Sequence, residues 1–281
     1  MAEKHQDAVG EADLHAIERI EREAWMDLFS IAPEECADQL GLWSARHPVA
    51  AVLAAREAPL VEFNRTLALG IDQPVGRDDL DRLAERMRTH CNPVRALAVP
   101  PVASRGTILA WLQDRGGTPH GSGVAKLHRD ASPAPDPACR TSLAVRLAEA
   151  PEAACFGAVV QGGFEAPPPF GRWFSGLVGR TRWKTCLAYD GDIPVASGAL
   201  FLNGDRAWLG VTATLPSHRR RGAQAAIVAR LLHEGAANGV AGFAAETTQP
   251  PAEEDGAHGS YGNLLRAGFS VAYVRPEYRF S

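Results

Sequence analysis

Residues 212–232, TATLPSHRRRGAQAAIVARLL, place three arginines and a glycine between a proline-marked turn and an apolar run at helical spacing. The first N–H groups of a helix have no partner within the helix, and they carry partial positive charge. Arg219, Arg220 and Arg221 add to that charge, which disfavours the helix unless an anion binds. The stretch therefore predicts an anion-binding site at the start of a helix.

The glycine in this stretch favours phosphate as the anion. Gly222 lets a ligand approach the main chain closely, and the N-terminus of a helix directs its N–H groups toward phosphate oxygens. Arginines add charge-assisted hydrogen bonds. The spacing matches neither the Walker A pattern nor GxGxxG, so we expect a pyrophosphate held in another way.

Composition limits the classes of function. The 281-residue chain is 46% hydrophobic, which suits one large domain or two of moderate size. Its net charge of −4 argues against a nucleic-acid partner, because such a partner needs a broadly basic surface. The arginine cluster is therefore a local feature, and a solvated basic patch is its alternative interpretation.

The five cysteines are scattered, odd in number and never spaced as CxxC: Cys36, Cys91, Cys139, Cys155 and Cys186. This pattern argues against a disulfide framework or a structural zinc site, and we expect no metal. The polar N-terminus lacks the apolar core of a signal peptide. Because no apolar run is long enough to span a bilayer, we expect a cytoplasmic protein with no membrane partner.

Hydrophobic periodicity divides the chain into two α/β units joined by a linker rich in Pro, Ala and Asp at 130–140. In the first unit, 1–129, the pattern predicts helices at 13–30, 34–42, 76–91 and 105–117, and strands at 49–54, 60–70 and 94–100. In the second, 141–281, it predicts strands at 141–148, 240–248 and 269–275, three hairpin strands within 183–214, and helices at 151–163, 170–180, 222–232 and 260–268.

The two units are faintly similar to each other. In each, a strand leads through a proline, Pro74 or Pro216, into a helix, and a strand and a second helix follow. We interpret this order as a tandem duplication of one α/β unit.

The stretch 215–232 resembles the acyl-CoA-binding motif of the GCN5-related N-acetyltransferase (GNAT) family, with Arg219, Gly222 and Gln224 on the motif positions. The flanking order agrees: hairpin strands precede it, and a strand and a short helix ending in LLRAGF (264–269) follow. The resemblance implies an α/β fold of tandem GNAT-like domains. Each would have a mixed, mostly antiparallel central sheet flanked by helices.

The resemblance also implies the donor and a mechanism. The donor is acetyl-CoA, whose pantetheine arm pairs with a strand that splays from its neighbour at a bulge, while a main-chain N–H polarises the thioester carbonyl. An amine then attacks directly. The residues expected to hold acetyl-CoA are Val211, Thr212, Ala213, Thr214, Arg219, Arg220, Arg221, Gly222, Ala223 and Gln224.

Two positions depart from the family pattern. Gln224 stands where the family has Gly or Ala, so its amide joins the contact, the helix shifts, or the side chain points to solvent. Leu264 stands where the family often has a tyrosine that protonates the leaving thiolate. Tyr261 lies one helical turn earlier as a substitute acid, with packing or substrate contact favoured over that role and water as another proton source.

The start of the last helix offers further CoA contacts. The family often has an asparagine there, and His258, Ser260 and Asn263 are the candidates. Ser260 is also a candidate N-cap, which is its favoured role, and Asn263 could instead bond to the backbone.

Glu246 is the leading candidate for the catalytic base. It lies in the strand beside the expected thioester, where a carboxylate with a raised pKa, or one acting through water, could deprotonate an ammonium. A structural carboxylate at the strand end is an equally good interpretation. His218 is expected to be a solvent-exposed turn residue. The segment RWF (Arg172 to Phe174) and Trp183 would flank an acceptor cleft, although aromatics are more often core.

The first unit has Asp78 and Asp79 where the second has its arginines. Acidic residues there favour the helix but repel phosphate. We therefore expect no CoA site in the first unit, which would instead pack on the second and wall the acceptor site.

The leading hypothesis is an N-acetyltransferase that moves an acetyl group from acetyl-CoA to a primary amine. The alternative is a non-catalytic CoA-binding regulatory module, which the missing tyrosine favours. The sequence leaves open an antibiotic, polyamine, amino acid or protein amine as acceptor, and a monomer or a homodimer as the assembly.

Overall fold

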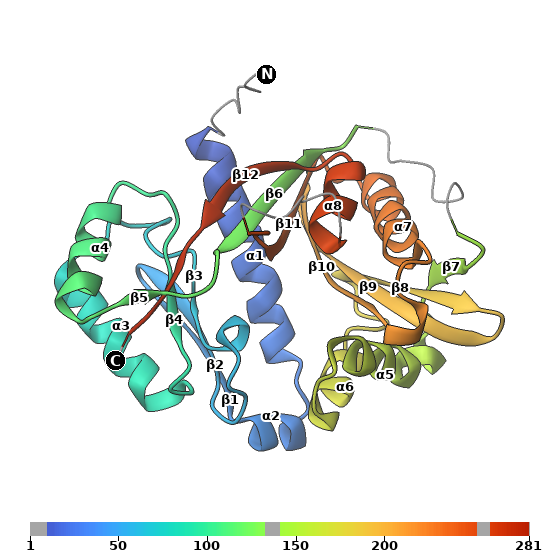
Figure 1. Ribbon diagram of the computed structural model, residues 1–281, viewed down its shortest axis with the longest axis horizontal. Helices are drawn as coiled ribbons and strands as arrows, with labels where there is room; N and C mark the ends of the chain where they lie inside the picture. Colours follow the sequence, from blue (N-terminus) through green and yellow to red (C-terminus); the bar gives the residue numbers. More distant parts are fainter. Residues whose placement is uncertain (1–9, 133–140, 252–258, 281) are drawn as a thin grey trace.

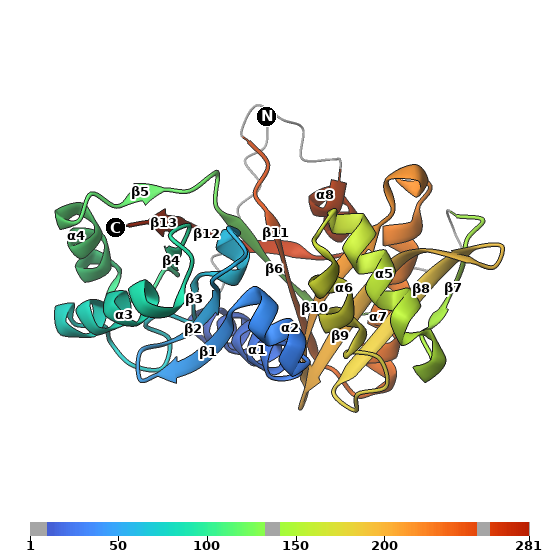
Figure 2. The ribbon, with the colours of Figure 1, turned by 90° about the horizontal axis from the view of Figure 1, so that it is seen from below.

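The long helix α1 (Glu11–Ser30) runs through the middle of the molecule, with a seven-stranded sheet on one side and two three-stranded sheets on the other (Figures 1 and 2). The computed structural model describes residues 10–132, 141–251 and 259–280. Within these ranges, no helix has the length and apolar character needed to cross a membrane.

The larger sheet has seven strands in the order β12-β6-β11-β10-β9-β8-β7. Only β10 and β11 run parallel, and all other neighbours are antiparallel. The strands are β6 (Val124–Asp130), β7 (Ala144–Leu147), β8 (Trp183–Asp190), β9 (Ile193–Asn203), β10 (Arg206–Thr214), β11 (Gly242–Thr248) and β12 (Ser270–Arg275). This is the mixed, mostly antiparallel sheet that the sequence predicts.

Helices cover both faces of this sheet (Figures 1 and 2). On one face, α7 (Ala223–Ala237) and α8 (Gly259–Arg266) enclose a core with the sheet. On the other face, α5 (Ala153–Phe164), α6 (Pro168–Ser175) and α1 enclose a larger core rich in aromatic residues. Both faces are therefore buried, which removes the alternation of apolar and polar residues from the central strands.

The other two sheets have three strands each, in the orders β1-β2-β3 and β4-β13-β5, and an isolated parallel bridge joins Arg65 to Ala96 between them. Their strands are β1 (Leu42–His47), β2 (Ala50–Ala55), β3 (Thr66–Leu67), β4 (Ala96–Ala98), β5 (Thr118–Pro119) and β13 (Glu277–Arg279). Helices α2 (Glu34–Leu40), α3 (Arg77–His90) and α4 (Arg105–Asp114) complete this part of the chain.

The strand predicted at 60–70 is largely wrong, because only Thr66–Leu67 is extended there. A 3₁₀ turn at Val61–Phe63 precedes it. The side chain of buried Asn64 explains the turn: its amide donates to the carbonyls of Ala55, Ala58 and Leu60 and pulls the chain back on itself. Local hydrogen bonding of this kind competes with strand formation.

Strands β6 and β13 are exchanged between the two parts of the chain. Strand β6 ends at the expected boundary near residue 130, yet it lies between β11 and β12 in the larger sheet. The last strand, β13, lies between β4 and β5 of the first part (Figure 2). The sheets therefore do not divide at the linker expected at 130–140, of which residues 133–140 lie outside the described structure.

Apart from this exchange, the two halves repeat one order of elements. Each has two helices, antiparallel strands, a helix, a strand, a second helix and two final strands, and the second half has the additional strand β7 at its start. Thus β3, α3, β4 and α4 of the first half correspond to β10, α7, β11 and α8 of the second. The repeated order supports the tandem interpretation of the sequence.

Candidate functional site

Strands β10 and β11 separate partway along their length. They pair from Arg206 opposite Gly242 to Leu209 opposite Ala245 and no further. Beyond that point β11 continues along β6, whereas β10 continues along β9. The main chain of β10 from 210 onward therefore borders a V-shaped opening in the sheet.

A bulge lies at the apex of this opening. The register between β10 and β9 shifts between Gly210 and Ala213, and Val211 has a φ of +54°. A β-branched residue with positive φ is strained by about 1–3 kcal/mol and persists only where the surroundings enforce it. The bulge occurs in the stretch where the sequence resemblance places it.

The arginine-rich stretch starts helix α7 as expected. Arg220 and Gly222 both have positive φ, +63° and +80°, and together turn the chain from a short 3₁₀ segment into the helix. The first bond within the helix runs from Ala226 N–H to the Gly222 carbonyl, at 3.1 Å. No side chain in the described part of the chain caps the helix. The preceding N–H groups therefore remain available to an anion.

The three arginines do not converge on this helix start. Arg219 donates to the Gly163 carbonyl at 3.0 Å, and Arg221 donates to Asp190 at 2.6 Å. This hydrogen bond to Asp190 raises the pKa of the exposed Arg221 guanidinium. Among the described residues, Arg220 alone of the three shows no such bond. His218 is only half-buried and lies 3.3 Å from Asp190.

Gln224 points into the protein and joins three elements. Its amide donates to Thr212 of β10 and to Ser260 of α8, both at 3.0 Å, and its carbonyl accepts from Asn263 at 2.5 Å. The solvent-facing alternative for Gln224 is therefore wrong. The network fixes the open strand, α7 and α8 relative to one another.

Two expectations for the start of α8 are corrected by the same network. Ser260 lies inside the helix, which begins at Gly259, so it is not the N-cap. Asn263 bonds to Gln224 and accepts from Arg266 at 2.7 Å, and its side chain makes no bond to the backbone of the described residues. His258 lies outside the described residues.

Tyr261 is half-buried and packs against the core between α7, α8 and the sheet. Leu264, on the same helix, is 3% exposed in that core. This surrounding supports packing as the role of Tyr261.

Glu246 is saturated with hydrogen bonds. One carboxylate oxygen accepts from Trp25 at 3.1 Å and Arg65 at 2.8 Å, and the other accepts from Lys126 at 3.0 Å and Arg275 at 3.4 Å. Burial alone would raise the pKa of Glu246, but the three cations outweigh burial and hold it well below the ordinary value. The raised pKa expected from the sequence is therefore wrong, and the structural interpretation is favoured.

Glu246 belongs to a buried ionic cluster where α1 meets strands of both halves. The cluster contains four carboxylates and three cations: Glu18, Glu21, Glu246, Glu277, Arg65, Lys126 and Arg275. Glu246 has the most exposed side chain of these, at 12%. Sequence reasoning missed the cluster, although Glu18 and Glu21 follow the apolar stripe of the helix predicted at 13–30.

Acid is expected to destabilise the protein through this cluster. The cations hold the pKa values of Glu18 and Glu246 below the ordinary 4.5. Their contribution is complete above 4.5 and is lost as the pH falls through the lowered values. Burial raises the pKa of Glu21, so the ionisation of this group lowers the free energy of unfolding as the pH rises above 4.5. Urea unfolding at a series of pH values measures this, and a free energy of unfolding constant down to about pH 3 would contradict it.

The first half repeats the positive φ at the end of the strand but closes the site. Ala68 of the first half has a φ of +52°, matching Val211, yet it is 2% exposed beneath Leu14 and Ile71. The start of α3 is also occupied, because Asp79 accepts from the Gly76 N–H at 3.0 Å. Both features support the expectation that the first half holds no CoA.

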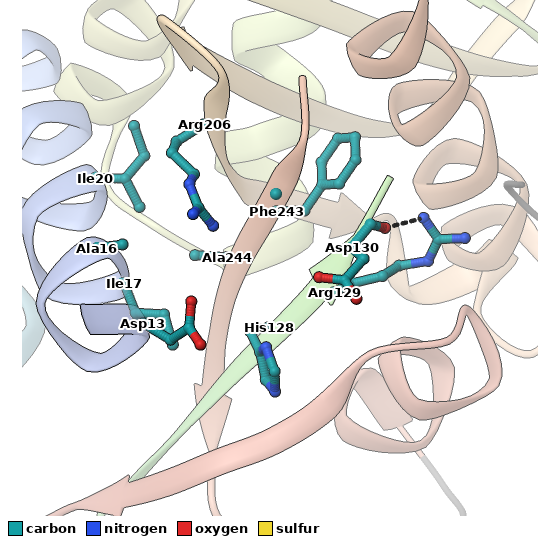
Figure 3. A pocket seen from close by; sticks show the side chains of 11 residues that line it. Asp13, Ala16, Ile17, Ile20, His128, Arg129, Asp130, Arg206, Phe243 and Ala244 are labelled. Carbon is teal, nitrogen blue, oxygen red and sulfur yellow. Dashed lines mark hydrogen bonds between the residues drawn. The ribbon is translucent and has the colours of Figure 1, made fainter. Parts of the chain in front are cut away.

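Two cavities lie away from the opening. One, of about 650 Å³, borders the first-half turn at Gly70 and Pro74. The other, of about 170 Å³, lies at the start of β10 and β11, where Asp13, His128 and Arg206 face it (Figure 3). Because Arg206 begins the paired part of β10, this second cavity is at the opposite end from the bulge. Within the described ranges, no group of three or more His, Cys, Asp or Glu residues is arranged to hold a metal.

Comparison with solved structures defines the class of fold. A GCN5-related N-acetyltransferase from Kribbella flavida is 15% identical and has a TM-score of 0.59, with 93% of this chain and 94% of that chain covered. A second, from Sphaerobacter thermophilus, is 17% identical with a TM-score of 0.58, over 96% of this chain and 93% of that chain. A functionally unknown conserved protein from Staphylococcus epidermidis is 11% identical with a TM-score of 0.52, over 83% and 90%.

The chain therefore has the fold of the GCN5-related N-acetyltransferases, with both halves included in the similarity. No model of a protein family matches the sequence, and no curated protein matches it either.

Proposed function

We propose that this protein is an N-acetyltransferase that transfers an acetyl group from acetyl-CoA to a primary amine. The observation that carries the proposal is the opening between β10 and β11, with its bulge at Val211 next to the uncapped start of α7. An extended amide-bearing arm can pair with the open strand, while its pyrophosphate meets the helix N–H groups.

Each element of the opening has a role in this proposal. The main chain at 211–214 pairs with the pantetheine arm, and the N–H groups at 222–224 hold the pyrophosphate. Arg220 lies exposed on the surface beside them, and Arg219 and Arg221 reach phosphate by exchanging their present partners. Gln224 positions the open strand and α8 through Thr212, Ser260 and Asn263.

In this proposal Glu246 is not the base that removes the proton of the amine. A carboxylate with four donors and a lowered pKa is a weak base. The acceptor therefore reacts as the free amine, with water taking its proton after attack. Water also protonates the CoA thiolate, because Tyr261 packs in the core.

The acceptor is a small-molecule or peptide amine bound on the face of the sheet that carries α1, α5 and α6. Residues 1–129 form a degenerate CoA-free unit that walls this face, and residues 141–281 form the acetyl-CoA unit. A cytoplasmic location and a monomeric or homodimeric state belong to the same proposal.

A CoA-binding regulatory module is the second candidate. Two features favour it. Glu246 is saturated with hydrogen bonds and so is not a free base, and Leu264 cannot act as the acid at the position where the family often has a tyrosine. Such a module would keep the opening and the start of α7 and would bind CoA without turnover.

Release of free CoA thiol from acetyl-CoA, followed with a thiol reagent across a panel of primary amines, separates the two candidates. An acetyltransferase gives saturable release with at least one amine and an acetylated product of the matching mass. Tight CoA binding with no release across the panel favours the regulatory module. Absence of CoA binding would overturn both.

A further inference from the structure

Trp208 differs from the other buried tryptophans in its hydrogen bonding. Its side chain is 3% exposed, and its indole N–H has no hydrogen-bond partner among the described residues. The other four buried tryptophans each donate this proton to a protein oxygen: Trp25, Trp111, Trp173 and Trp183. A buried donor without a partner is costly and rare, so it points to an acceptor atom supplied by a ligand.

The indole of Trp208 lies along β10 toward the bulge. Its six-membered ring fills the space that a side chain at Gly210 would need, because a Cβ at Gly210 would stand 2.1–2.8 Å from its atoms. Glycine at 210 therefore allows this orientation. The next residue, Val211, is the bulge residue itself.

Trp208 also pairs with Ala244 of β11, the strand on the other side of the opening. Its ring lies 5.8 Å from that of Trp25, centroid to centroid, and Trp25 donates to Glu246 of β11. The last paired residue of β10 before the opening is Leu209. Trp208 therefore lies one residue before the point where the two strands separate, on the face of the sheet covered by α1 and α5.

The apex is where the acyl end of the donor would lie. The pyrophosphate sits at Gly222 in the proposed function, and the arm runs back along β10 from 214 to 211. The thioester then reaches the bulge, farthest from the phosphate. This step rests on the proposed function.

We propose that the indole N–H of Trp208 donates a hydrogen bond to the thioester carbonyl oxygen of the bound acyl-CoA. When the amine nitrogen bonds to the carbonyl carbon, the carbonyl π pair moves onto this oxygen. The oxyanion then reforms the carbonyl as the carbon–sulfur bond breaks and the thiolate leaves. The amine loses its proton to water, and the thiolate takes one from water. The hydrogen bond from the indole N–H to this oxygen strengthens as negative charge develops on the oxygen.

Trp208→Phe tests this proposal by removing the N–H and retaining an aromatic ring. Calorimetric titrations compare free CoA, which lacks the carbonyl, with acetyl-CoA. We expect affinity for acetyl-CoA to fall about fivefold, the size of one neutral hydrogen bond, while affinity for CoA is unchanged. Trp111→Phe is the matched control, since Trp111 lies in the first half and its N–H already bonds to Asp81, and it should leave both affinities unchanged.

A measurement on the unsubstituted protein covers the case in which the variant fails to fold. With ¹⁵N-labelled tryptophan, acetyl-CoA should shift one indole N–H signal that free CoA leaves in place. The Gly210→Ala variant displaces the ring of Trp208, so in this variant the two ligands should no longer differ in their effect on that signal. If both ligands bind but neither readout separates them, the role of Trp208 is wrong and the CoA site stands. If neither ligand binds the unsubstituted protein, the proposed function fails.

Discussion

Arg275→Met is expected to lower the free energy of unfolding by about 3–5 kcal/mol, the cost of removing one partner of a buried ion pair. Arg275 is 0% exposed and donates to Glu18 and Glu21 at 2.8–3.1 Å and to Glu246 at 3.4 Å. Carboxylates already outnumber cations in the cluster. Removing this guanidinium leaves the remaining negative charges facing one another in a dry interior.

The effect should be confined to the buried cluster. Chemical unfolding measures it, with Arg88→Met as the control, because Arg88 pairs with Glu85 and both side chains are more than half exposed. That pair contributes about 0–1 kcal/mol. Adding Glu18→Gln to Arg275→Met should recover part of the loss, since it removes one of the unpaired charges. An unfolding midpoint for Arg275→Met equal to that of the control would contradict the cluster's role.

Gly222→Asp is expected to weaken binding of CoA and acetyl-CoA by at least about 100-fold, or ~2.7 kcal/mol. Gly222 has a φ of +80°, which an aspartate adopts only with strain. Its side chain would also stand in the path of the anion, where its negative charge repels phosphate. Titration calorimetry with both ligands measures the change.

Gly239→Asp is the matched control for this prediction. Gly239 follows the other end of α7 and has a φ of +78°, and a Cβ added there would meet no described atom within 4 Å. The same charge and backbone strain are introduced on the same helix, away from the opening. Affinity that falls equally in both variants would mean that the start of α7 is not the binding site. Unchanged affinity in Gly222→Asp would have the same consequence.

Local sequence determined much of the fold near the candidate site. Pro216, Gly222 and the apolar run that follows lie within a few residues of one another, and they specify a turn and a helix start through local backbone preferences. The turns at Gly191 and Gly204 likewise specify the hairpins of β8, β9 and β10. Such features need no knowledge of distant residues, and the structure has them where the pattern predicts.

The strand at Val124–Asp130 could not be predicted in the same way. Lys126 is 1% exposed although it lies on the opposite face of the strand from its buried neighbours Ala125 and Leu127. It is buried because the carboxylates of Glu21 and Glu246, distant in sequence, meet it there. A strand buried on both faces has no alternating pattern to read.

The sequence by itself determined that an uncapped helix start follows an antiparallel hairpin, and hence a place suited to a pyrophosphate. The tertiary structure alone decided that β6 and β13 exchange between the halves, that Glu246 is held ionised, and that Leu14 covers Ala68. The physical reason is range. Turn and cap preferences act between neighbours in the chain, whereas strand pairing, ion-pair formation and burial join residues that only folding brings together.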